Sequence, residues 1–217
     1  TLGDSYFPFL AYSCFPITAT SLVYNINMDN SFAVYLSSAD NVLGNLVGQV
    51  YTEGVNYSWP TTITNTVALN SGTNYLHVVG TNVGGPAGFL GSFQLTDAGY
   101  KFSNGGSTLG TNTTNWTVTN SQPNPGTFAT PTVTPTSYGV NGIAPWGGMG
   151  IQQPTAQWIW SNDTGANGGF NTVYFSTKIS ANSPAPEPST YALMGIGGLL
   201  IAFRMKNKAG MGSAFAA

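Results

Sequence analysis

Short apolar runs separated by turn-forming residues fill the first 180 positions of the chain. In the run Phe32–Leu36 every second side chain is large and apolar, which puts one face of a strand into a core and leaves the other half-covered. The runs Tyr75–Val79 and Phe89–Leu95 follow the same rule. From Ala19 to Val50 no stretch has the apolar spacing of a helix, so the pattern predicts β-structure.

We expect strands over residues 21–26, 32–36, 46–50, 75–79 and 89–95, and a last strand over 173–179 that closes the domain. Turn signals recur between and beyond these runs: Asp40-Asn41, Asn70-Ser71-Gly72, Gly84-Gly85-Pro86, Asn104-Gly105-Gly106, Asn141-Gly142 and Asn167-Gly168-Gly169. Short strands joined by such turns predict an antiparallel β-sandwich or barrel over residues 1–180.

Residues 120–137 are rich in Pro, Thr and Asn and form either a long surface loop or a linker. We favour a loop, because the apolar residues that follow would otherwise lack a core. These residues are Trp146, Trp158, Ile159, Trp160, Val173, Tyr174 and Phe175.

The chain changes character after the last expected strand. A Pro-rich spacer at residues 181–190 is followed by an apolar run, Tyr191–Phe203, and then by a basic end with Arg204. As a helix, this apolar run would be roughly 20 Å long, which is short for a hydrocarbon core of about 30 Å. We therefore expect a marginal hydrophobic anchor helix over 191–208, with its basic end on the cytoplasmic side, and a short tail at 209–217.

Pro186-Glu187-Pro188, the glycine-containing apolar run and the basic cluster from Arg204 stand in a characteristic order. Together they resemble the PEP-CTERM sorting signal of Gram-negative bacteria that make exopolysaccharide. The resemblance implies recognition by an exosortase, a transpeptidase-like membrane protein, and delivery to the cell surface or extracellular matrix. An uncleaved tail would keep the protein anchored in the membrane. Thr1 also fits the start of a mature chain whose signal peptide has been removed.

Charged residues are only 6% of the chain, against about 25% in typical domains. Residues 1–183 contain two lysines and six acidic residues, a formal charge of −4, and no arginine. Such a body cannot neutralise a run of phosphates, which excludes nucleic acid as a partner. Cys14 is the only cysteine, so an internal disulfide is also excluded, and we expect it to be a buried apolar residue.

Three segments of the body resemble the galactose-binding-like jelly rolls attached to bacterial glycosidases: Asp29–Tyr35, Leu69–Leu76 and Thr81–Gly88, with Trp158-Ile159-Trp160 near the end. The resemblance implies an antiparallel jelly-roll sandwich and, secondarily, a sugar ligand. Members of this class often carry a structural calcium ion, for which Asp29, Asp40 or Asp97 are the candidate ligands. A structural role of Asp29 in a turn is the competing interpretation.

Sugar recognition combines flat aromatic faces with a few polar groups. The candidate carbohydrate-binding residues are Tyr57, Trp59, Asn82, Trp116 and Trp146. Each is also a candidate for ordinary core or loop packing.

The sequence contains few residues in an arrangement suited to catalysis. His77 is the only histidine and lies in an alternating strand, where a packed side chain is the simpler interpretation. The acidic residues show no spacing that singles out a pair for glycoside hydrolysis. We therefore expect no enzyme and no cofactor other than calcium.

Three functions fit the sequence. The first is a structural or adhesive surface protein that associates with itself or with neighbouring surface subunits. The second is a carbohydrate-binding module for exopolysaccharide. The third is an extrinsic subunit of a larger membrane complex, held by its C-terminal helix.

Overall fold

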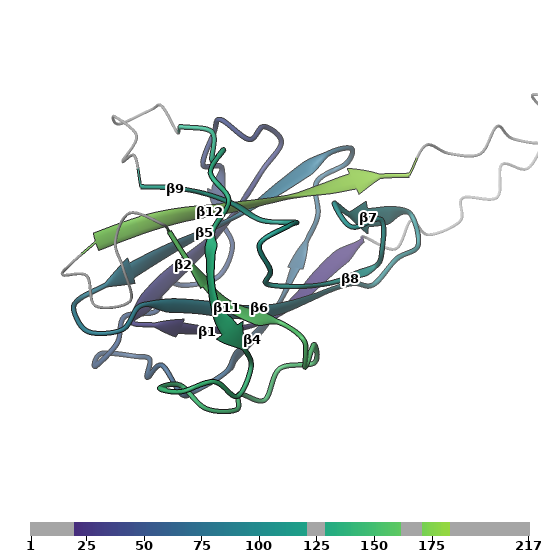
Figure 1. Cartoon of the computed structure of the whole chain (residues 1–217). Helices are drawn as coiled ribbons and strands as arrows, with labels where there is room; N and C mark the ends of the chain where they lie inside the picture. The colour runs from purple at the N-terminus through teal and green to yellow at the C-terminus, as the bar shows by residue number, and fades with distance from the viewer. Residues whose placement is uncertain (1–19, 121–128, 162–170, 183–217) are drawn as a thin grey trace, which may run out of the picture. The chain divides into compact units, whose positions relative to one another are not determined.

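The computed structural model describes residues 20–120, 129–161 and 171–182, and within them every regular element is a β-strand (Figure 1). The strands are β1 (Ser21–Asp29), β2 (Ser31–Ser37), β3 (Asn45–Leu46), β4 (Ile63–Ala68), β5 (Asn74–Asn82), β6 (Gly88–Leu95), β7 (Tyr100–Phe102), β8 (Thr108–Gly110), β9 (Thr117–Thr119), β10 (Thr136–Val140), β11 (Gln157–Trp160) and β12 (Asn171–Ala181). The prediction of an all-β body is confirmed.

The strands form two antiparallel sheets. The first sheet has the order β10-β11-β6-β1-β4, and β8 pairs with β6 beside β11. The second has the order β3-β2-β5-β12-β7, and β9 also pairs with β12. This arrangement is consistent with a β-sandwich.

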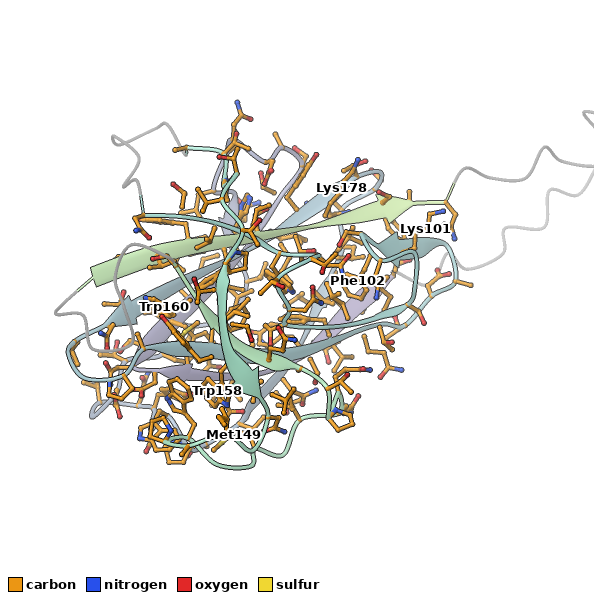
Figure 2. The ribbon with its side chains drawn as sticks, viewed as in Figure 1. Lys101, Phe102, Met149, Trp158, Trp160 and Lys178 are labelled. Carbon is orange, nitrogen blue, oxygen red and sulfur yellow. The ribbon has the colours of Figure 1, made fainter. Side chains whose placement is uncertain are left out.

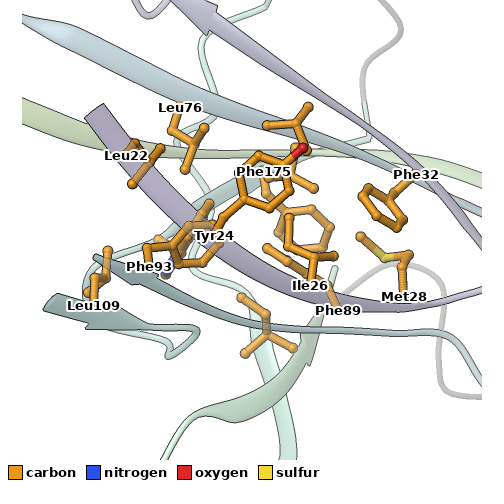
Figure 3. Packing of buried hydrophobic residues seen from close by; sticks show 14 of the residues in the cluster. Leu22, Tyr24, Ile26, Met28, Phe32, Leu76, Phe89, Phe93, Leu109 and Phe175 are labelled. Atoms are coloured by element: carbon orange, nitrogen blue, oxygen red, sulfur yellow. The ribbon is translucent and has the colours of Figure 1, made fainter. Parts of the chain in front are cut away.

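Both sheets contribute to one hydrophobic core, shown in Figure 3. Alternate residues of β1, from Leu22 to Met28, are fully buried, as are Leu76 and Val78 of β5. Trp160 of β11 and Phe175 of β12 belong to the same cluster, with ring centroids 5.5 Å apart. The apolar residues on both sides of the Pro- and Thr-rich segment therefore share a core.

A second cluster lies on the other face of the first sheet. Leu90 of β6 and Trp158 of β11 pack there against Trp146 and Ala156 from the segment between β10 and β11, with Met149 at its edge (Figure 2). Next to this cluster, the same face of the sheet carries polar side chains that bond to one another. Asn25 accepts a hydrogen bond from Thr64 (2.6 Å), and Asn27 accepts one from Thr62 (2.8 Å).

The expected strand over Leu46–Val50 is wrong beyond its first residue, because β3 ends at Leu46. Gly48 takes a φ of +109°, which is outside the range of a strand and favours glycine. Beyond β3 the chain meets β2 through single contacts, a hydrogen bond from Val47 N to Val34 O at 2.8 Å and an isolated bridge between Tyr51 and Phe32. Residues 47–50 therefore run along the edge of the second sheet but do not extend β3.

The expected helix over 191–208 and Cys14 lie outside the described residues. Within the part of the chain that the structure describes, no helix is long and apolar enough to cross a membrane.

Candidate functional sites: an acidic cluster and a polar pocket

Asp29, Asn30 and Glu53 form a cluster, named here the acidic cluster, where β1 turns into β2. The Asn30 side-chain amide donates to Asp29 Oδ1 at 2.7 Å and also to Glu53 Oε2. Its Oδ1 accepts a bond from the backbone N–H of Val83 at 2.8 Å. Asn30 therefore connects the two acids to the segment between β5 and β6.

Asp29 is buried and accepts a second hydrogen bond, from Trp146 Nε1 to its Oδ2 at 2.9 Å. Trp146 stacks on Trp158 with ring centroids 4.6 Å apart. Burial raises the pKa of Asp29 to about 6, because it disfavours the charged carboxylate. The bonds from Trp146 and Asn30 oppose that rise, and the charge of Glu53 adds to it.

Tyr57 and Trp59 lie next to this cluster. The Tyr57 hydroxyl accepts a bond from Met28 N at 2.8 Å and donates to Trp59 O at 3.3 Å. Burial also raises the pKa of the Tyr57 phenol. Asn82, at the end of β5, folds its side chain onto the turn that follows, at Gly84 and Gly85.

The structure thus brings Asp29, Tyr57, Trp59 and Trp146 together, and it places Trp116 elsewhere. Trp116 lies in the main core, with its ring centroid 5.3 Å from that of Phe89. Tyr57, Trp116 and Trp146 are 7%, 1% and 4% exposed, and Trp59 is half-buried. In this conformation the buried rings pack on protein, so the carbohydrate-binding role of these residues stays a prediction.

Calcium binding by Asp29 also stays a prediction. Both carboxylate oxygens of Asp29 accept hydrogen bonds from protein donors. Among the described residues, no three His, Cys, Asp or Glu side chains lie close enough to hold a metal ion.

His77 is fully buried under the segment between β2 and β3, as a packed histidine should be. Its Nδ1 faces Leu43 O at 3.0 Å, and its Nε2 faces Asp40 Oδ1 at 3.2 Å. Ser176 of β12 donates to the same Asp40 oxygen at 2.5 Å. The acid therefore lies between the histidine and the serine, whereas nucleophilic catalysis needs the histidine between the other two.

A pocket of about 360 Å³ lies beside Asp40 and spans β12, with Tyr75 of β5 on one side of this strand and the segments that carry Ser103 and Asn115 on the other. Its walls carry side chains that donate or accept hydrogen bonds, together with one aromatic ring. They are Asp40, Tyr75, Ser103, Thr114, Asn115, Thr117, Ser176, Thr177 and Lys178. We call this site the polar pocket.

Sequence reasoning missed the polar pocket. Its residues come from five separate parts of the chain, and most are serines, threonines and asparagines in a sequence full of them. The one available signal was the polar run Ser176-Thr177-Lys178 between the apolar residues Phe175 and Ile179 of the final strand.

Comparison with known protein families gives a match in the tail of the chain. Residues 184–207 match the PEP-CTERM protein-sorting motif, so the chain carries the sorting signal that its tail resembles. No curated protein and no solved structure matches the chain. The galactose-binding-like resemblance of the body accordingly stays a prediction.

Proposed function

We propose that this protein is an exported, non-catalytic surface protein that an exosortase sorts through residues 184–207, and that its β body is the part displayed outside the cell. The sorting motif is the observation that carries the proposal. The low charge and the all-β body agree with a structural or adhesive role. The interposed position of Asp40 between His77 and Ser176 also favours a non-catalytic body.

Self-association is the second part of the proposal. β4 is the last strand of the first sheet, and it contains no charged residue and no proline. Natural sheets usually protect such edges with lysine, proline or a covering segment. Among the described residues, no strand pairs with the outer edge of β4, and such an open edge supports pairing between copies of this chain.

Substitution of the sorting motif tests the proposal in the native host. Replacing Pro186-Glu187-Pro188 by three alanines should hold the protein in the cell envelope and deplete it from the surface or extracellular fraction. Pro154→Ala, at an exposed proline of the body, is the control and should leave the distribution unchanged. Unaltered surface delivery of the triple variant would contradict sorting by this motif. Retention of the unsubstituted protein in membranes would instead favour the anchored subunit of a larger complex.

A further inference from the structure

The polar pocket lies where the pairing of β12 is interrupted. On one side of β12, β9 pairs with residues 174–176 and β7 pairs with residues 179–181. Thr177 and Lys178 lie between these two ladders, and the segments that carry Ser103 and Asn115 meet β12 there through side chains. Thr177 Oγ1 donates to Asn115 O at 2.8 Å and lies 3.3 Å from Ser103 Oγ.

The walls of the pocket have the chemistry of a site for hydroxyl groups. Five serine and threonine hydroxyls and the Asn115 amide can each donate and accept hydrogen bonds. Ser176 Oγ already donates to Asp40 and Thr177 Oγ1 to Asn115 O, so what these hydroxyls offer a ligand is their oxygen atoms as acceptors. A ligand with many hydroxyls can donate to such oxygens in place of water, which an apolar ligand cannot do. The ring of half-buried Tyr75 offers the one flat apolar surface.

The Asp40 carboxylate is held in place by protein hydrogen bonds and can accept a hydrogen bond from a ligand. Both of its protein hydrogen bonds, from His77 and Ser176, reach Oδ1, while the side chain keeps 26% of its surface exposed. Burial pushes the pKa of Asp40 upwards, but the hydrogen bonds from His77 and Ser176 and the charge of His77 outweigh it and leave the pKa below its ordinary value. A fixed carboxylate oxygen is thus available to accept from a ligand hydroxyl.

Charge narrows the class of ligand further. The pocket contains one carboxylate, Asp40, and one ammonium group, Lys178, which is exposed on β12 (Figure 2). Their charges balance, so the site does not favour an anion such as phosphate over a neutral molecule. A volume of about 360 Å³ is at the small end of the range for ligand pockets, which suits one sugar ring rather than a long chain.

We propose that the polar pocket binds one neutral glycosyl unit, with Asp40 and Asn115 bonding its hydroxyls and Tyr75 packing on a ring face. The inference does not rest on sorting, because it concerns the purified protein in solution. It places carbohydrate binding at residues other than the aromatic candidates chosen from sequence.

The test is a nuclear magnetic resonance titration of the full chain with D-glucose, D-galactose, D-mannose and N-acetyl-D-glucosamine, measured separately. We expect saturable shifts of backbone amides at residues 114–117 and 176–178 with at least one of the four sugars. Titration with dextran, a neutral glucose polymer, then distinguishes a site for free sugar from one that accepts a unit within a chain. Absence of saturable shifts at these amides with every sugar would overturn the proposal.

Two variants make the assignment specific. Asp40→Asn keeps an oxygen for His77 and Ser176 but loses the charge, and it should weaken binding about tenfold. Tyr75→Ala should weaken it to a similar degree; it removes the ring that stacks on His77, with centroids 6.4 Å apart, but none of the hydrogen bonds to Asp40. The matched controls are Glu53→Gln, in the acidic cluster, and Tyr138→Ala, on β10 of the first sheet. Equal affinity in all four variants would place the sugar elsewhere and overturn the proposal.

Discussion

Trp146 and Asp29 are 117 positions apart in the chain and are joined by a buried hydrogen bond, in which the indole Nε1 donates to Oδ2 at 2.9 Å. The bond ties the segment between β10 and β11 to the end of β1. It also gives a buried carboxylate one of its two protein donors. Removing this bond should therefore change both the free energy of unfolding and its dependence on pH.

Trp146→Phe should keep most of the stacking on Trp158 and lose this donor. Leaving the Asp29 oxygen unsatisfied should lower the free energy of unfolding by about 1–3 kcal/mol, as measured by urea denaturation at neutral pH. The matched control is Trp158→Phe, because among the described residues Trp158 Nε1 has no hydrogen-bond partner. That control should lose packing energy alone and leave the pH dependence of stability unchanged.

Asp29 should make the protein more stable in mild acid than at neutral pH. Its pKa is about 6 in the folded state and 3.8 in the reference state, so the folded protein binds the proton more tightly. This contribution is fully present below the reference value and is lost as the pH rises through about 6. The free energy of unfolding should fall by about 2–3 kcal/mol over this window, the upper value being that of an unscreened group.

Denaturation curves across the window, compared with those of Asp29→Asn, check this expectation. The variant should lack the fall, because it has no proton to lose there. Asp40 and Asp97 have lowered pKa values, so their contributions are lost only at lower pH, as the pH falls. A variant with the same slope as the unsubstituted protein would assign the effect to another group.

Gly80 is a position where the core accepts no side chain. A Cβ at this residue would lie 2.8 Å from the ring of Trp160 and 3.0 Å from the sulfur of Met28. Gly80→Ala should destabilise the protein by about 1–3 kcal/mol through overpacking, as measured by thermal or urea unfolding. Gly148→Ala, where nothing lies within 4 Å, is the control and should change stability by less than about 1 kcal/mol.

Much of the second sheet could be predicted from alternation, since β2, β5 and β12 each have a continuous buried face that the sequence displays. The end of β3 at Leu46 could not be predicted, because the apolar composition of Leu46–Val50 does not reveal the positive φ of Gly48. Residue type also could not separate Trp116, in the core, from a ring that faces solvent. The polar pocket depends on long-range register, which joins Asp40 to Ser176 across 136 positions.

The outer edge of β4, with which no strand of the described residues pairs, should support association between copies of the chain. Size-exclusion chromatography with light scattering should show a mass that rises with protein concentration. Thr66→Lys, which places a charge at an exposed position of β4, should reduce that rise. Thr134→Lys, exposed and outside the strands, is the control. A monomer at every concentration would contradict self-association.

Sorting through the PEP-CTERM motif is the central claim, and the intact mass of the protein from its native host, measured in each cell fraction, tests it most directly. We expect a surface or extracellular species whose mass ends near Pro188, before the apolar run Tyr191–Phe203. A full-length chain confined to the cytoplasm would contradict the account.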